Sequence, residues 1–174
     1  AGEAFPSIEL GGYRVLAGTP VGVAHLMRAL PRVSLGRASY PLRLLLHGPY
    51  HTPLACAVAE RAQRELALLP FTRPRIALVD GRGVRFGPLS TDPAALAAYS
   101  LDTQVREPFD FTATVRVALR EWAPERVVLT GPGNTLGGVV GQILAAEGWG
   151  GIHSRADFTA RQESLEPIVV SMGR

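Results

Sequence analysis

The 174-residue sequence contains one cysteine, Cys56, and no lysine, because all eighteen of its basic residues are arginine. A single thiol excludes an internal disulfide and any zinc site built from several thiolates. Without lysine the chain has no Schiff-base amine and no P-loop lysine. These absences exclude pyridoxal-phosphate chemistry anchored on this chain and nucleotide hydrolysis of the P-loop type.

Long apolar runs are also missing. The longest, from Leu136 to Ala146, contains Gly138, Gly141 and Gln142 and is shorter than the roughly 18 residues that a membrane-spanning helix needs. The first residues show neither the basic nor the apolar region of a signal peptide. The arginines are scattered and no aromatic cluster accompanies them, so we expect no nucleic-acid partner. The sequence therefore predicts a cytoplasmic protein that binds neither membranes nor nucleic acids.

What the sequence does contain is enough apolar material for a folded core, since 47% of its residues are hydrophobic. Thr19-Pro20, Thr52-Pro53 and Asp92-Pro93 each join a helix N-cap residue to a proline at the first helical position. These pairs, the apolar periodicity and the Pro and Gly stop signals together predict five helices. The predicted helices span residues 20–30, 53–69, 93–99, 111–122 and 135–147.

Short apolar runs of strand length lie between the predicted helices. They are Tyr13–Ala17, Leu42–His47, Arg75–Val79 and Arg126–Thr130. Helices that alternate with short apolar strands indicate an α/β fold with at least partly parallel pairing. Residues 81–92 and 148–157 are rich in glycine and are predicted to be loops.

One strand-to-helix connection carries a histidine where α/β folds place their ligands. Residues 44–54 read Leu-Leu-Leu-His-Gly-Pro-Tyr-His-Thr-Pro-Leu, so a predicted buried strand enters a Gly-Pro turn, presents His51 and continues into a capped helix. A rigidly held imidazole suits a general base. The alternative is a loop histidine satisfied by a backbone carbonyl. His47 and His51 have a metal-ligand spacing, but Gly48-Pro49 prevents the helix that would bring them together, and no metal site is expected.

A second segment, residues 127–138, reads Val-Val-Leu-Thr-Gly-Pro-Gly-Asn-Thr-Leu-Gly-Gly, which predicts a strand, a glycine-rich turn and a helix. Such a turn can cradle an anion at a helix amino terminus. Its glycine spacing matches neither a P-loop nor a dinucleotide fingerprint. Two interpretations stay open, a purely structural turn and a small-ligand binding module.

Two other residues, Asp102 and Cys56, lie in segments that give weaker evidence for a functional site. Residues 102–111 are predicted to form a polar loop in which Asp102 is a candidate to orient a histidine. Cys56 has alanine on both sides in a predicted helix and is interpreted as a packing residue. No Gly-x-Ser-x-Gly nucleophile elbow occurs in the sequence, so a candidate base is present without a nucleophile.

In their order and spacing these segments resemble the second half of malonyl-CoA:acyl-carrier-protein transacylases and of the related acyltransferase domains of polyketide and fatty-acid synthases. Residues 48–54, Gly-Pro-Tyr-His-Thr-Pro-Leu, are similar to the family's Gly-Pro-Phe-His-Ser-Pro-Leu. Residues 104–109, Gln-Val-Arg-Glu-Pro-Phe, are similar to its Gln followed by x-Pro-Val, and residues 131–138 match its Gly-Pro-Gly-x-x-Leu-x-Gly. Residues 14–18 resemble the family's strand that ends in Ser-Gly. The resemblance covers about residues 10–147.

The resemblance implies acyl transfer, with malonyl as the expected group, from acyl-CoA to the phosphopantetheine thiol of an acyl carrier protein. The reaction passes through a serine acyl-enzyme and needs no cofactor beyond the acyl-CoA substrate. His51 is implied as the base that takes the serine proton and later activates the thiol. Gln104 is implied as the residue whose main-chain carbonyl receives the other imidazole N–H.

The family's serine elbow, carboxylate-binding arginine and oxyanion loop all precede residue 1 in family order. We therefore expect the nucleophile half to lie in the same or another polypeptide, and this chain alone to be inactive. Residues 7–13 depart from the family's Asn-x-Asn-Pro-x-Gln segment, so they give no guide to the acyl group.

The resemblance also implies an α/β-hydrolase-like acyltransferase large subdomain with an inserted ferredoxin-like small subdomain. Residues 1–47 are expected to be the remnant of the small subdomain, and residues 48–174 the C-terminal part of the large one. The competing hypothesis is a non-catalytic scaffold domain that lacks the nucleophile and binds carrier protein.

Overall fold

The computed structural model describes residues 2–36, 38–45 and 47–173. Contacts divide the chain into two compact units. Unit 1 comprises Ala1–Ile8, Val15–Arg73 and Leu89–Phe109, and unit 2 comprises Glu9–Arg14, Pro74–Pro88 and Asp110–Arg174. The subdomain boundary after residue 47 stays a prediction.

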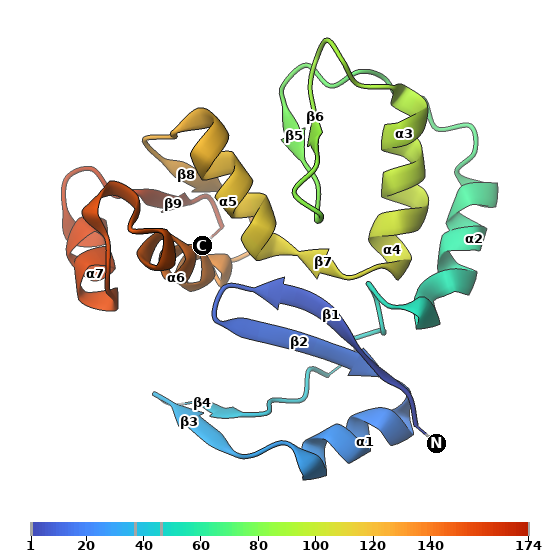
Figure 1. Cartoon of the computed structure of the whole chain (residues 1–174), viewed down its shortest axis with the longest axis horizontal. Helices are drawn as coiled ribbons and strands as arrows, with labels where there is room; N and C mark the ends of the chain where they lie inside the picture. Colours follow the sequence, from blue (N-terminus) through green and yellow to red (C-terminus); the bar gives the residue numbers. More distant parts are fainter. Residues whose placement is uncertain (1, 37, 46, 174) are drawn as a thin grey trace. The chain divides into compact units, whose positions relative to one another are not determined.

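Unit 1 is mainly helical (Figure 1). Its first helix, α1, spans Pro20–Ala29, and the Thr19 hydroxyl accepts the Gly22 amide as the predicted N-cap. A 3₁₀ turn at Pro53–Ala55 leads into α2 at Cys56–Glu65. A third helix is continuous through α3 (Pro93–Ala98), a π-helical turn (Tyr99–Thr103) and α4 (Gln104–Arg106). The antiparallel pair β3 (Val33–Leu35) and β4 (Ala38–Tyr40) follows α1.

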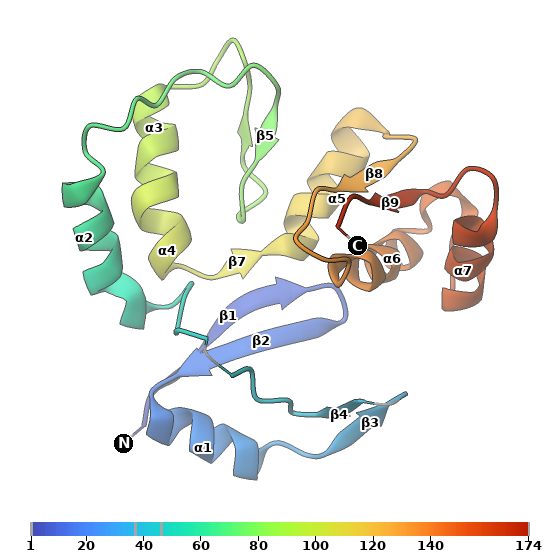
Figure 2. The same cartoon turned by 180° about the vertical axis from the view of Figure 1, so that it is seen from behind.

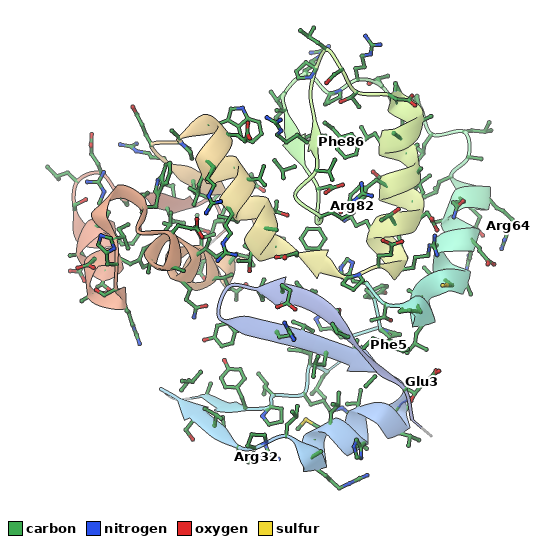
Figure 3. The ribbon with its side chains drawn as sticks, viewed as in Figure 1. Glu3, Phe5, Arg32, Arg64, Arg82 and Phe86 are labelled. Atoms are coloured by element: carbon green, nitrogen blue, oxygen red, sulfur yellow. The ribbon has the colours of Figure 1, made fainter. Side chains whose placement is uncertain are left out.

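A hairpin of β1 (Ala4–Leu10) and β2 (Tyr13–Gly18) starts the chain, with a turn at Gly11 and Gly12. The sheet has the strand order β2-β1-β7, with β7 at Phe109–Asp110. In unit 1 the backbone of Glu3 lies against the start of α1, where its carbonyl accepts the Thr19 amide at 3.0 Å (Figure 3).

Unit 2 is built around α6 (Leu136–Glu147), which is apolar on nearly all sides as its sequence predicts. It packs with α5 (Phe111–Trp122), α7 (Arg155–Glu163) and the parallel pair β8 (Val127–Leu129) and β9 (Val169–Ser171) (Figure 2). The best-buried side chains of this core are no more than 2% exposed; they are Leu119, Val140, Ile143, Leu144 and Ile152.

A short antiparallel hairpin, β5 (Leu78–Val79) and β6 (Arg85–Phe86), completes unit 2. The carboxylate of Asp80 is buried in its turn and pairs with the Arg82 guanidinium at 2.6 Å (Figure 3).

The two faces of the β8–β9 pair differ. Val127, Leu129 and Val169 pack against the core of unit 2. Val128 and Val170, which are partners in the strand register, are 54% and 36% exposed. We call these two residues the outer face of β8–β9. Because parallel sheets are normally covered on both sides, this apolar face is an unusual feature.

Several expected elements are shorter, longer or absent. The helix predicted over residues 53–69 ends at Glu65, whereas the one predicted over 93–99 continues to Arg106. The run Leu42–His47 is not a strand at residues 42–45 and 47, and Leu45 is 77% exposed rather than buried; Leu46 lies outside the described residues. In the parts of the chain that the structure describes, no helix has both the length and the apolar character that crossing a bilayer requires.

Glu147, the last residue of α6, links this helix to α5. Its carboxylate accepts hydrogen bonds from Arg116 at 2.6 Å and from Arg120 at 2.7 Å, and its side chain is 12% exposed. The hydrogen bond from Arg120, more than that from Arg116, holds the pKa of Glu147 below its ordinary value of 4.5.

A lowered folded-state pKa means that the ionised pair stabilises unit 2 above about pH 4.5 and loses this contribution as the pH falls toward the lowered value. We expect Glu147→Gln to reduce the free energy of unfolding at pH 7 and to flatten its decline between about pH 5 and pH 3. Urea unfolding at several pH values measures both. The exposed Glu125→Gln of the same unit is the control, and an equal decline in Glu147→Gln and wild type would contradict the expectation.

Candidate active site

His51 lies on a strained segment of backbone between the Gly-Pro turn and α2. Its φ of +58° is in the left-handed region, which costs a residue with a side chain about 1–2 kcal/mol. Neighbouring groups hold this conformation. The hydroxyl of Thr52, which is 0% exposed, donates to the Pro49 carbonyl at 2.6 Å, and the buried Ser7 hydroxyl donates to the Tyr50 carbonyl at 2.9 Å.

Thr52 occupies the expected N-cap position, with Pro53 at the first helical position. The side chain of Thr52 makes no capping hydrogen bond to the 3₁₀ turn. The hydroxyl instead closes the turn that precedes it, so Thr52 fixes the path of the chain into His51.

His51 donates to two consecutive main-chain carbonyls. Its Nδ1 lies 2.5 Å from the carbonyl oxygen of Gln104, and its main-chain N–H donates to the carbonyl of Val105 at 2.8 Å. A carbonyl only accepts, so Nδ1 carries the proton of the neutral ring and Nε2 keeps the lone pair. The contact expected between His51 and the Gln104 carbonyl is therefore present, while the catalytic roles of the two residues stay predictions.

The imidazole is also held by packing. The ring of Phe109 lies 5.5 Å from it, centroid to centroid, at a tilt of 48°. His51 is half-buried, so part of the ring remains accessible. A half-buried imidazole with one nitrogen anchored and the other basic is chemically suited to take a proton from a hydroxyl or a thiol.

Asp102 was a candidate to orient the histidine, but its carboxylate pairs with Arg106 and Gln63 rather than with His51 itself. The predicted polar loop 102–111 is helical as far as Arg106. The Asp102 carboxylate accepts from Arg106 Nε at 2.7 Å and Nη2 at 2.9 Å, and from the Gln63 amide at 3.1 Å. The hydrogen bond to Asp102 raises the pKa of the Arg106 guanidinium above its ordinary value. This network ties the end of the α3–α4 helix to α2.

The glycine-rich turn belongs to unit 2, whereas His51 and Gln104 belong to unit 1. Its Gly131 and Gly133 have φ values of +98° and +74°, which favour glycine. The turn lines a hollow of about 170 Å³ together with Phe111, Val128 and Leu136. None of the residues that line the hollow is titratable. An anion cradle at a helix amino terminus uses main-chain N–H groups, so both interpretations of the turn stay open.

The described residues offer no candidate metal site. No group of three or more His, Cys, Asp or Glu side chains suited to a metal ion occurs within residues 2–36, 38–45 and 47–173. Cys56, the first residue of α2, forms no disulfide, is half-buried and interacts with the Arg106 side chain.

Two solved acyl-carrier-protein S-malonyltransferases are structurally similar to this chain. The enzyme from Burkholderia pseudomallei 1710b has a TM-score of 0.65 and 22% identity, over 82% of this chain and 44% of that chain. The enzyme from Vibrio cholerae O1 biovar eltor str. N16961 has a TM-score of 0.66 and 18% identity, over 99% of this chain and 47% of that chain. No family model and no curated protein matches the sequence. The chain spans a little under half the length of these enzymes, and its mixed α/β fold resembles part of the malonyltransferase fold.

Proposed function

We propose that this chain supplies the general base of an acyltransferase that moves a malonyl group from malonyl-CoA to an acyl carrier protein. The observation that carries the proposal is the contact between the His51 Nδ1 and the Gln104 carbonyl, at 2.5 Å. It fixes the tautomer whose Nε2 accepts a proton. The similarity to the malonyltransferase fold supports the same conclusion.

In this mechanism Nε2 of His51 removes the proton of a serine hydroxyl as its oxygen attacks the thioester carbonyl of malonyl-CoA. The tetrahedral intermediate then expels the CoA thiolate, which takes the proton from the imidazolium. In the second half-reaction His51 deprotonates the phosphopantetheine thiol, whose sulfur attacks the carbonyl carbon of the malonyl-serine ester. The tetrahedral intermediate expels the serine oxygen, which takes the proton back from the imidazolium. The Gln104 carbonyl stabilises each imidazolium as a neutral acceptor, in the position that a carboxylate occupies in a Ser-His-Asp triad.

The serine comes from a part of the enzyme outside these 174 residues, in the same or another polypeptide. Two findings support this: the sequence has no Gly-x-Ser-x-Gly elbow, and the match covers 44% and 47% of the two enzymes. In the same proposal, residues 48–174 are the C-terminal part of the α/β-hydrolase-like large subdomain. Residues 1–47 then remain from its ferredoxin-like insertion.

The position of the acyl-enzyme ester tests this proposal. The chain is tagged in its native cell, purified with the polypeptide that accompanies or continues it, and incubated with malonyl-CoA. Peptide mass spectrometry should find a malonyl ester on a serine in a Gly-x-Ser-x-Gly sequence outside residues 1–174. Addition of carrier protein bearing phosphopantetheine should discharge it.

Recombinant residues 1–174 alone, treated in the same way, should gain no malonyl group. An ester on one of this chain's own serines would overturn the assignment of the nucleophile. Absence of any ester in the native assembly would favour the scaffold hypothesis.

A further inference from the structure

The last turn of α4 ends in an unusual way. In a continuing helix the carbonyl of Gln104 would accept the N–H of the residue four positions later, but that residue is Pro108, which has none. The helical pattern holds up to that point, because the Glu107 amide donates to the Thr103 carbonyl at 2.9 Å.

The backbone turns away at Glu107. Its φ of −114° and ψ of 152° are extended, as expected for a residue that precedes proline. The next two carbonyls in line, those of Gln104 and Val105, are the two that accept from His51. The helix thus ends where its free acceptors match the two donors of one histidine.

Side-chain hydrogen bonds also hold this last helical turn in place. Asp102 lies one helical turn before Arg106 and joins it to Gln63 on α2 through three hydrogen bonds of 2.7–3.1 Å. The Asp102 side chain is 26% exposed, so solvent screens this network only in part. Because Gln104 and Val105 lie between the two members of the ion pair, the network limits the movement of their carbonyls.

We propose that Pro108 and Asp102 are positioning residues for the histidine. Pro108 leaves the Gln104 carbonyl without a helical donor, and Asp102 holds the turn that presents it. The inference rests on the proposed function, in which His51 is the base, but its test reads the imidazole directly and needs no activity.

The test measures which ring nitrogen of His51 carries the proton. The full chain is labelled with ¹⁵N-histidine, and the Nδ1 and Nε2 chemical shifts of its four histidines are recorded above neutral pH. The His51 signals are assigned by their loss in His51→Asn. In the wild type they should report the Nδ1–H tautomer.

Pro108→Ala introduces an amide that competes for the Gln104 carbonyl, so the His51 signals should move to a mixture of the two tautomers. Pro70→Ala is the matched control, because Pro70 is also exposed and also follows the end of a helix, α2. It should leave the His51 signals unchanged. A pure Nδ1–H tautomer in folded Pro108→Ala would overturn the role of Pro108.

Asp102→Asn gives a second, independent measurement on the same signals. This substitution removes the negative charge that pairs with Arg106. We therefore expect the His51 signals to shift part of the way toward those of a mixture of the Nδ1–H and Nε2–H tautomers. The control is Glu65→Gln, which removes the exposed ion pair with Arg61 at 2.8 Å on α2. Signals unchanged in Asp102→Asn would overturn the role of Asp102.

In the assembled enzyme, Pro108→Ala should lower kcat by about tenfold, less than loss of the base itself, and leave KM nearly unchanged. A lower kcat with a wild-type tautomer would assign the effect to something other than positioning. Full transfer by His51→Asn would refute the proposed function while leaving the tautomer result intact.

Discussion

Replacing His51 with asparagine should lower malonyl transfer by about 10²–10⁴-fold, the usual contribution of a positioned general base. Asparagine tolerates the left-handed φ of +58° better than most residues. Its Nδ2 amide stands near the position of Nδ1 and can donate to the Gln104 carbonyl. It has no basic nitrogen in place of Nε2. The fold should therefore persist, with a free energy of unfolding within about 1 kcal/mol of wild type.

Two measurements check this result: the rate of transfer to carrier protein in the assembled enzyme, and urea unfolding of the chain. Gln104→Ala is the control, because it retains the main-chain carbonyl that accepts from His51. Its loss of rate should be far smaller. Equal, severe losses in both variants would refute the separate roles given to the two residues, and full activity of His51→Asn would favour a scaffold domain.

Gly22→Ala should destabilise the chain by about 1–3 kcal/mol, the usual cost of inserting a methyl group into a packed site. In a helix this change normally stabilises by about 1 kcal/mol. Gly22 lies inside α1, however, and a Cβ atom there would overlap the Glu3 carbonyl oxygen. That carbonyl also accepts the Thr19 amide, so moving it disturbs the start of the helix.

Gly138→Ala is the matched comparison. This glycine lies in the first turn of α6, and a Cβ atom would meet nothing within 4 Å. It should stabilise by up to about 1 kcal/mol. Urea unfolding of the two variants should thus give changes of opposite sign, and two stabilising changes would contradict the close approach of Glu3 to α1.

Helices were the more predictable part of this fold, because their signals are local. Thr19 and Asp92 cap α1 and α3 as their Thr-Pro and Asp-Pro pairs predict, and Gly148 ends α6 in the left-handed conformation. Strands depend on partners far along the chain. The apolar run Leu42–His47 has the composition of a buried strand but pairs with no strand through residues 42–45 and 47. Three-residue β9 was not expected at all.

The sequence predicted which residues form the candidate site better than it predicted the contacts that hold them in place. Motif resemblance indicated His51 and Gln104, and the structure brings them together across 53 positions of sequence. The left-handed backbone of His51 is held by the local hydrogen bond from Thr52 to Pro49 and by a hydrogen bond from Ser7 to Tyr50. The Ser7 contact spans 43 positions of sequence, so no local pattern reports it. The Gln63–Asp102 contact is equally non-local. Pro108 is the exception, because a proline four residues after Gln104 is visible in the sequence.

A polypeptide that bound the outer face of β8–β9, where Val128 and Val170 are exposed, would make the stability of unit 2 depend on its own concentration. A polypeptide that binds this face only in the folded state adds RT ln(1 + [L]/Kd) to the free energy of unfolding, about 2.7 kcal/mol at a hundredfold excess over Kd. The unfolding temperature of the chain would then rise with the concentration of its partner, at constant solvent conditions. Thermal unfolding measured at several concentrations of that polypeptide would therefore report its binding to this chain.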